Sequence, residues 1–518
     1  MRLLVAVLAT AVLGAALAVV GVSAAGASVA SGAAGTSGNP LVTIRAIDRA
    51  GKPVAVTASL QSLVIAGGVD DTLTSAHPTR VPPGTYNIAA WVWEPGKTAA
   101  TLVDREVKIT ANVTVTFDAR PGRLIRFTVN DSTVTQDYVA AEPFAPDGYD
   151  AFDGSRATPA GATYAVPGAL PPGYYLYLEA AMIRPHDDLS PVEYRLVRLI
   201  KGTIPTDLTF ASDRAELASD DVTLKAVDPG AVGGVGFAAL APGASYDLPS
   251  GVVGQWATPP FSVEFYFTPG YQWQACVFYG PQGCDIDDLN NLPVFGVHHY
   301  AQTFGSAVFG PSPQVGAVVS GNQLQVGTDG GGLLVDPTQE LDTSYGLPVS
   351  AEQTWLYEGK KLLARGSGDV SATISAAPHW YTMRIQASRG AGATLSRSVA
   401  LYYNFRTQAG HDSPDAFWPR VIPSGLSERN AARSGTRTTV PIWFSDLGGD
   451  IVAHGVKAWV SVNGGATWRA LRVSGSGYRW TVVVANPAKA GYVSLRVQGT
   501  DSAGDTVAVT TVDAYAVS

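Results

Sequence analysis

The residues best suited to chemistry lie close together, between positions 271 and 291. Cys276 and Cys284, the two cysteines of the chain, flank a Gly-Pro turn. In an oxidising compartment, two cysteines this near in sequence form a disulfide that closes a hairpin loop. Loop-closure entropy gives such a short ring roughly 2.5 kcal/mol of stabilisation. Two free thiols are the alternative, and the apolar and acidic neighbours do not favour a nucleophilic cysteine.

An acidic run follows the second cysteine directly. Its hard oxygen ligands suit Ca²⁺, although the spacing does not follow the EF-hand pattern. A solvated polar loop without metal is the other interpretation. The candidate calcium ligands are Asp285, Asp287, Asp288 and Asn290.

Aromatic residues surround the cysteine segment. Tyr271, Trp273 and Tyr279 would bind a sugar by apolar contact between ring faces if they were exposed. Burial in the core of a β-sandwich is the alternative. A pair of carboxylates for glycoside hydrolysis has no fixed spacing in sequence, so a weak glycosidase remains within this interpretation.

Composition limits the class of protein. The chain has 518 residues, of which 46% are hydrophobic and 15% charged, with 56 Gly and 34 Pro. Many turn residues and little charge are typical of a multi-domain β protein and argue against a coiled coil. The net charge of −8 provides no field that would attract nucleic acid, so we expect no nucleic-acid partner.

The N-terminus predicts export. A short basic start precedes an uncharged apolar stretch at residues 3–22, and small residues follow it. We interpret residues 1–30 as a signal peptide and residues 31–40 as a flexible mature N-terminus. An uncleaved anchor helix is the alternative, and it would be the chain's only contact with a membrane. The expected location is extracellular or associated with the cell envelope.

Alternating apolar and polar residues predict strands along most of the chain, most clearly at residues 439–518. A sheet with one dry face must bury that face against a second layer. We therefore predict an all-β fold of tandem β-sandwich domains, Ig-like or carboxypeptidase-regulatory-like.

A short repeat helps to place the domain boundaries. Pro-Pro-Gly followed by an aromatic strand start occurs at residues 82–86 and again at 171–175. In both copies we expect the aromatic side chain to enter the core. The predicted units are a sandwich at 41–120, a diverged copy at 121–216, a larger β domain with the disulfide loop at 217–423, a linker at 424–438 and an Ig-like domain at 439–518.

Several segments carry a family resemblance. They read DRAGKP at 48–53, PGTY at 83–86, VTVTFDAR at 113–120, VFGP at 308–311, LYEGK at 356–360 and VNGGATW at 462–468, with further similarity at 400–407 and 493–504. This order resembles the non-catalytic C-terminal accessory region of large secreted subtilisin-like serine peptidases of actinobacteria. The resemblance covers most of the mature chain and implies β-sandwich architecture.

The peptidase motifs of that family are not found. The triplet at 35–37 repeats three letters of the nucleophile motif in the segment after the leader, and His454-Gly455 repeats two letters of the histidine motif inside a β domain. We therefore predict no catalytic residue.

Two functional hypotheses follow from these observations. The first is an exported, non-catalytic β-sandwich protein that binds a protein or cell-envelope partner, or assists a separate secreted peptidase. The second is a carbohydrate-binding module protein or weak glycosidase that uses the aromatic loop. Ca²⁺ is the one cofactor that the sequence suggests.

Overall fold

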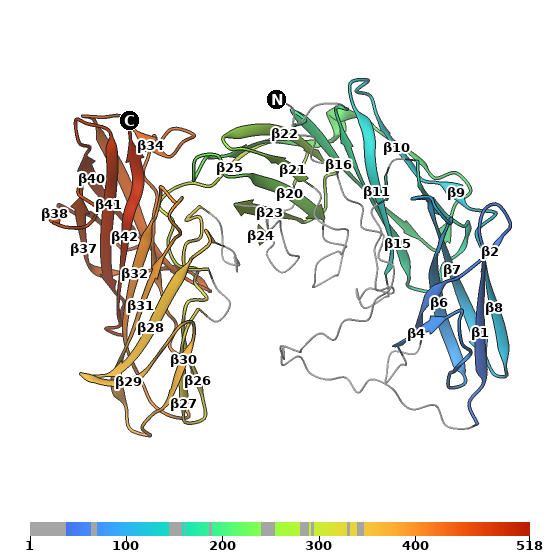
Figure 1. Ribbon diagram of the computed structural model, residues 1–518, viewed down its shortest axis with the longest axis horizontal. Helices are drawn as coiled ribbons and strands as arrows, with labels where there is room; N and C mark the ends of the chain where they lie inside the picture. The colour runs from blue at the N-terminus through green and yellow to red at the C-terminus, as the bar shows by residue number, and fades with distance from the viewer. Residues whose placement is uncertain are drawn as a thin grey trace.

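The computed structural model describes residues 38–63, 70–144, 158–159, 161–185, 189–239, 254–279, 290–291, 295–328, 332–338 and 346–518. These residues form β-strands and turns, with one 3-10 turn, η1 (Arg214–Glu216). The prediction of an all-β fold of tandem β-sandwiches is confirmed. Figure 1 shows the N-terminal strands at one end, β20 to β24 in the middle and the C-terminal strands at the other end.

The predicted signal peptide and most of the predicted flexible N-terminus lie outside the described residues. In the part that is described, no helix has the length and apolar character needed to cross a membrane.

The N-terminal lobe is a sandwich built from the first eight strands. They are β1 (Leu41–Ile47), β2 (Pro53–Val54), β3 (Thr57–Ser62), β4 (Asp70–Thr74), β5 (Thr79–Arg80), β6 (Gly84–Trp93), β7 (Ala100–Ile109) and β8 (Val113–Asp118). A four-stranded sheet around β1 faces a six-stranded sheet that contains β4, β3, β6 and β7 in this order. Tyr86 is buried at the start of β6, as the repeat predicted. Its hydroxyl also donates a hydrogen bond to the Pro82 carbonyl at 2.8 Å.

The central lobe contains a seven-stranded sheet with the order β12-β11-β15-β16-β22-β19-β25 and a four-stranded sheet with the order β21-β20-β23-β24. Its strands are β9 (Arg123–Leu124), β10 (Arg126–Val129), β11 (Thr135–Phe144), β12 (Thr158–Pro159), β13 (Thr163–Ala165), β14 (Gly168–Ala169), β15 (Tyr175–Ile183), β16 (Val192–Lys201), β17 (Thr203–Ile204), β18 (Thr209–Ser212), β19 (Ala218–Leu224), β20 (Gly233–Ala239), β21 (Gly254–Ala257), β22 (Phe261–Phe267), β23 (Trp273–Tyr279), β24 (Asn290–Asn291) and β25 (His299–Phe304).

The six-stranded and seven-stranded sheets are buried on both faces. On β6, Ile88 and Ala90 belong to the core of the N-terminal sandwich, whereas Ala89 and Trp91 pack toward the seven-stranded sheet. On β15, one set of alternate residues packs in the same apolar layer as Ala89 and Trp91, and the other set packs against β20 and β23. Each of these sheets therefore belongs to two successive layers. Strands buried on both faces have near-continuous apolar sequences, as these do.

The predicted domain boundaries do not match this arrangement. The boundary at 120/121 is crossed because β13 pairs in parallel with β7, which places it in the six-stranded sheet. The boundary at 216/217 is crossed because β16 pairs with β22 inside the seven-stranded sheet. Periodicity locates strands, but it does not say with which strand each one pairs.

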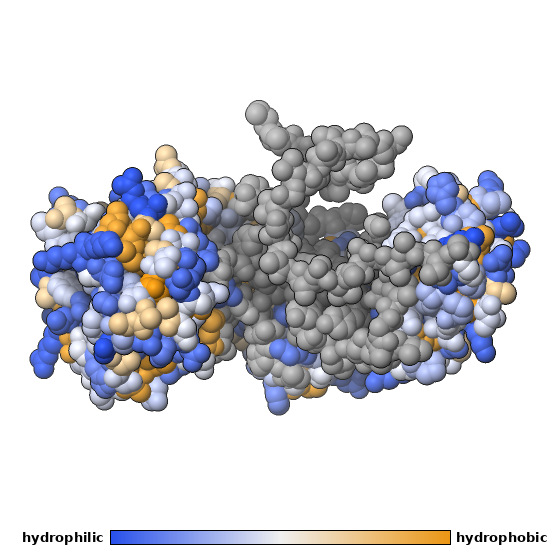
Figure 2. All heavy atoms as spheres, turned by 90° about the horizontal axis from the view of Figure 1, so that it is seen from below, coloured by the Kyte–Doolittle hydropathy of each residue, from blue (hydrophilic) through white to orange (hydrophobic). Residues whose placement is uncertain are grey.

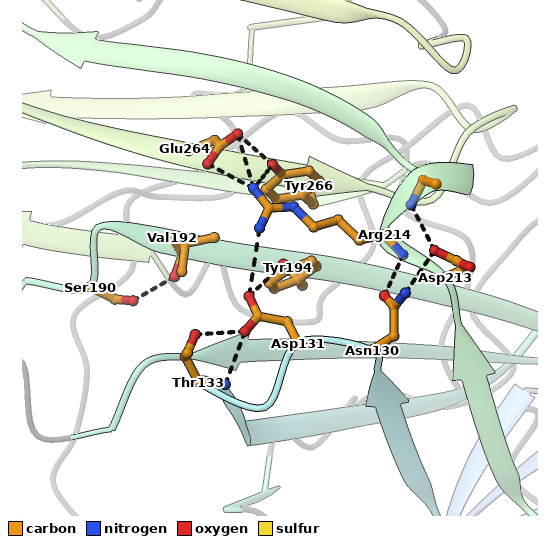
Figure 3. A network of polar contacts seen from close by, with 11 residues as sticks. Asn130, Asp131, Thr133, Ser190, Val192, Tyr194, Asp213, Arg214, Glu264 and Tyr266 are labelled. Carbon is orange, nitrogen blue, oxygen red and sulfur yellow. Dashed lines mark hydrogen bonds and ion pairs between the residues drawn. The ribbon is translucent and has the colours of Figure 1, made fainter.

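A polar network connects η1, at the end of residues 121–216, to the seven-stranded sheet (Figure 3). The Arg214 guanidinium lies 3.2 Å from a Glu264 carboxylate oxygen and hydrogen-bonds the Tyr266 hydroxyl. The Tyr194 hydroxyl donates to Asp131 at 2.8 Å, and the Thr133 hydroxyl donates to the same carboxylate. The Thr133 hydrogen bond in particular lowers the pKa of Asp131. The network joins β16 and β22 to η1 and to the turn before β11.

The C-terminal lobe is a sandwich around one large apolar core. Its strands are β26 (Gly316–Ser320), β27 (Gln323–Gly327), β28 (Ala351–Glu358), β29 (Lys361–Gly366), β30 (Val370–Thr373), β31 (His379–Ser388), β32 (Ser398–Thr407), β33 (Trp418–Val421), β34 (Ala431–Ala432), β35 (Arg437–Asp446), β36 (Gly449–Ile451), β37 (His454–Ser461), β38 (Arg469–Leu471), β39 (Ser474–Ser476), β40 (Arg479–Ala485), β41 (Gly491–Thr500) and β42 (Thr506–Val517). A nine-stranded sheet with the main order β29-β28-β31-β32-β42-β41-β37-β38 faces a three-stranded and a five-stranded sheet.

The nine-stranded sheet overturns the predicted separation between residues 217–423 and the last domain. Strand β32 pairs with β42 from Ser398 opposite Val512 to Asn404 opposite Thr506. The predicted linker at 424–438 contains β34, which pairs with β42. Strands before and after the supposed linker therefore share one sheet and one core.

Asn430, within that segment, connects the central and C-terminal lobes. Its side-chain amide donates to the carbonyls of Ala226 and Gly305 at 3.0 and 2.7 Å, and its carbonyl oxygen accepts from the Ala307 N–H at 2.9 Å. The residue is fully buried and has φ +52, a left-handed conformation that asparagine tolerates. Three backbone groups of the junction therefore depend on one side chain.

We expect Asn430→Ala to destabilise the junction by about 3 kcal/mol, because buried backbone groups lose their partners. Calorimetric unfolding of the full chain measures this loss. Asn430→Gly is the informative companion, because glycine accepts positive φ but lacks the amide. We expect it to remain destabilised; wild-type stability would show that backbone conformation, and not hydrogen bonding, is what matters here.

A second prediction concerns Asp104 on β7. Both of its carboxylate oxygens are buried, and this burial raises the pKa of Asp104 to about 7, against 3.8 for an exposed carboxyl. Because the folded state holds this proton more tightly, the contribution of Asp104 to stability is fully present below about pH 4 and is lost as the pH rises to about 7. The change amounts to roughly 4 kcal/mol. Asp104→Asn should remove this dependence in pH-resolved unfolding, whereas Asp71→Asn, at an exposed position of β4, should retain it.

Candidate functional site

The nine-stranded sheet has a dry inner face and a solvated outer face. On β32, Val399, Leu401 and Tyr403 are buried in the core, whereas the alternating Ala400 and Tyr402 lie on the outer face. The same two-residue alternation runs along β42. Strand geometry produces this division because successive side chains point to opposite faces.

Strand register aligns the outer-face residues into rows across the sheet. Trp355 lies opposite Arg384, which lies opposite Tyr402, which lies opposite Ala508. A neighbouring row runs from Gln386 through Ala400, Thr510 and Arg496 to Trp459. Residues from distant parts of the sequence are thereby brought side by side.

These rows form a groove with a volume of 660 Å³. Short side chains of Ala400, Ala508 and Thr510 lie on the central strands β32 and β42, and larger aromatic side chains lie on both flanks. The full lining is Trp355, Tyr357, Arg384, Ile385, Gln386, Ala400, Leu401, Tyr402, Trp459, Arg496, Gln498, Ala508 and Thr510. We call this feature the sheet groove.

Stacking contacts hold the groove's arginines in place. The Arg384 guanidinium carbon lies 5.3 Å from the ring centre of Tyr357 and 5.8 Å from that of Tyr402. The Arg496 guanidinium lies 4.6 Å from the Trp468 ring, and its Nε donates to the Thr510 hydroxyl at 2.9 Å. Such cation–π contacts contribute about 0.5–1 kcal/mol at exposed sites. The guanidinium groups are thus oriented without a carboxylate partner in the described structure.

The aromatic residues singled out in sequence lie elsewhere and face inward. Trp273 is fully buried and packs on Phe267, with ring centres 4.7 Å apart. Tyr279 packs against the cores of both the central and C-terminal lobes, and burial raises its pKa. Tyr271 is partly buried against the central core. Core burial, the alternative weighed for this cluster, is what is observed for Trp273, whose ring offers no face to a sugar.

The predicted disulfide and calcium site fall mostly on undescribed residues. Cys276 is buried on β23, but Cys284, Asp285, Asp287 and Asp288 lie outside the described residues. Asn290 lies on β24 opposite Ala275. Both sites remain predictions. Over the described part of the chain, no three or more His, Cys, Asp or Glu side chains are grouped as a metal site.

A buried charge cluster on β15 and β16 is the other concentration of reactive groups. Arg195 is fully buried, with its guanidinium 2.6 Å from Glu193 and 3.3 Å from Glu179. Gln255 donates to Glu193 at 2.6 Å, and Tyr177 donates to Glu179 at 3.1 Å. Burial raises the pKa of Glu193, and the adjacent Arg195 opposes that shift. Both carboxylates share one arginine, which is the arrangement of a structural ion pair inside a layered core.

A second hollow lies in the N-terminal lobe. It has a volume of 580 Å³ and is lined by hydroxyl and small side chains of β3, β4 and the turn after β4, together with Trp91 and Trp93. Trp91 is only 4% exposed, so most of its ring is already in contact with protein. The lining of the sheet groove contains four aromatic residues, against two here, and it also contains two arginines.

Sequence reasoning did not identify the sheet groove. The alternation within residues 398–407 and 506–517 marked which residues face away from the core. However, the order of the strands, which decides which outward residues meet, was not available from periodicity.

Comparisons with known proteins add little. No protein-family model matches the chain, and no curated protein matches it. Among solved structures, Escherichia coli alpha-2-macroglobulin activated by porcine elastase aligns at 10% identity with a TM-score of 0.14. The alignment covers 92% of this chain and 52% of that chain, so this chain spans about half the length of that protein. At this TM-score the likeness carries no argument about function.

Replacing Arg195 and Arg384 in turn tests whether the arginines of the sheet groove stabilise the fold. Arg195→Met should cost about 3–5 kcal/mol of unfolding free energy, because it leaves two buried carboxylates without a countercharge. Arg384→Met should cost less than about 1 kcal/mol, because only exposed stacking is lost. Urea unfolding of both variants measures the difference. A large loss for Arg384→Met would mean that the groove arginines are structural.

Proposed function

We propose that this chain is an exported, non-catalytic β-sandwich protein that binds a polysaccharide of the cell envelope or its surroundings in the sheet groove. The observation that carries the proposal is the sheet groove itself, which is flanked by Trp355, Tyr357 and Trp459. Aromatic faces give apolar contact to the flat faces of sugar rings, and nearby amides and hydroxyls supply hydrogen bonds.

The chemistry of the lining supports binding over cleavage. Glycoside hydrolysis needs a pair of carboxyl groups beside the scissile bond. Among the described residues that line the sheet groove, none is Asp or Glu. Glu179 and Glu193 are buried in another lobe and bound to Arg195. A ligand seated in this groove therefore meets stacking and hydrogen-bonding groups but no acid.

The shape of the groove supports an extended ligand. Its residues come from β28, β31, β32, β42, β41 and β37, neighbouring strands of one sheet. On the face of the molecule shown in Figure 2, apolar residues at both ends occur in small groups among polar ones. A groove that crosses strands suits a chain-like molecule better than a compact one. The predicted signal peptide and the resemblance to secreted accessory regions favour an extracellular glycan and a non-catalytic role.

The partner hypothesis from the sequence remains the second candidate. Trp273 is fully buried and Tyr279 is only partly buried, so we place the glycan at the sheet groove rather than at these aromatic residues. No structural feature of the described residues favours that partner specifically. We therefore give the glycan priority.

Alanine variants of the groove test the proposal. We expect Trp355→Ala and Trp459→Ala each to weaken binding by tenfold or more in affinity electrophoresis on a panel of neutral and acidic polysaccharides, since each stacking ring contributes on the order of 1.4 kcal/mol.

The matched control is Trp443→Ala. Trp443 lies on β35 in the opposing sheet and carries Arg479 at 4.7 Å from its ring, so it repeats the Trp–Arg pairing outside the groove. We expect this variant to bind like the wild type. Equal loss in all three variants, or retention of a secreted peptidase with no binding to any polysaccharide, would contradict the proposal.

A further inference from the structure

We infer that the ligand of the sheet groove is an acidic polysaccharide whose sugar rings carry carboxylates, a polyuronate. This inference rests on the proposed function and specifies its ligand. The observation behind it is the charge of the groove: its lining includes Arg384 and Arg496, and no carboxylate among the described residues.

The charge of the groove does not follow from overall composition. The whole chain carries a net charge of −8, with 43 acidic and 35 basic residues. A local site with arginines and no acid is therefore opposite in sign to the chain that contains it. Such a site favours an anionic ligand over a neutral one.

The two arginines are available for a ligand. Elsewhere in this protein, arginines near the surface hold carboxylates: Arg214 contacts Glu264 at 3.2 Å, and Arg479 contacts Asp450 at 3.2 Å. Within the described structure, Arg384 and Arg496 instead stack on aromatic rings and form no ion pair. Stacking occupies the face of the guanidinium. Apart from the Arg496 Nε, which donates to Thr510, the nitrogens along the edge remain for a carboxylate in a two-pronged hydrogen-bonded pair.

The spacing of the arginines indicates a polymer. Arg384 is on β31 and Arg496 on β41, with β32 and β42 between them. Three inter-strand steps correspond to about 14 Å. The Arg384 guanidinium is held against Tyr357 and Tyr402, and the Arg496 guanidinium against Trp468, so the two charges sit at different aromatic rings. A ligand that contacts both in these positions carries repeated charges along an extended chain.

The aromatic residues of the sheet groove favour polyuronates over other polyanions. Trp355 and Tyr402 flank Arg384 in one row, and Trp459 lies opposite Arg496 in the next. A ligand must therefore present a flat apolar face beside each charge. A pyranose ring with a carboxylate substituent does so, whereas the flexible backbone of a polyol phosphate does not.

The test compares two ligands that differ only in charge. A soluble polyuronate and its methyl ester have the same sugar backbone, but the ester has no carboxylates. With the full chain in calorimetry or affinity electrophoresis, we expect at least tenfold tighter binding to the free acid. This preference should weaken as salt rises from about 0.05 to 0.5 M, because screening shortens the reach of the charges.

Variants assign the preference to the groove. Arg384→Gln and Arg496→Gln keep a polar side chain but remove the charge, and we expect them to bring binding of the acid down to that of the ester. Arg479→Gln is the control and should keep the full preference. A polyol phosphate polymer is included as a further ligand, and we expect it to bind no better than the ester.

The possible results separate the two proposals. Equal binding of acid and ester by the wild type, sensitive to Trp355→Ala, would overturn the polyuronate inference and leave glycan binding in place. Tighter binding of the polyol phosphate than of the polyuronate would also overturn the inference. Binding of none of these polymers, nor of any neutral polysaccharide, would overturn the proposed function as well.

Discussion

The burial of one face of the nine-stranded sheet is the constraint on which the site depends. Leu401, Tyr403 and Val509 point into the core of the C-terminal lobe, and each buried side chain of this size contributes about 1.5–3 kcal/mol. A one-residue shift of β32 or β42 would expose these side chains, and the same shift of β31 would bury Arg384 and Gln386. The core therefore selects a single register. Because the outer face carries the alternate residues, the same choice brings Trp355, Arg384 and Tyr402 into line.

Sharing of sheets is the organising feature of the rest of the chain. The six-stranded and seven-stranded sheets each lie between two apolar layers, so β6, β11 and β15 are buried along most of their length. Charged residues in such strands must find partners inside the protein, as Arg195 does with Glu179 and Glu193. Layers that share sheets leave few independent surfaces in this part of the molecule. The outer face of the nine-stranded sheet remains available for a ligand.

The existence of the strands and the all-β class followed from alternation, most clearly at residues 439–518. The domain boundaries did not, because the pairing of β32 with β42 and of β13 with β7 joins segments that are distant in sequence. The near-continuous apolar runs of β11 and β15 were a signal that both faces were covered. For the site, local clustering of aromatics pointed to Trp273, which is core. The groove is assembled from separate strands, and local sequence does not reveal such an assembly.

The most direct test of the central claim is a crystal structure of the chain with a uronic-acid oligosaccharide. The account predicts that the sugar chain crosses the nine-stranded sheet between Trp355 and Trp459, with a carboxylate against Arg384 or Arg496. A ligand bound instead in the hollow beside Trp91 and Trp93, or nowhere on this sheet at concentrations that saturate binding in solution, would contradict it.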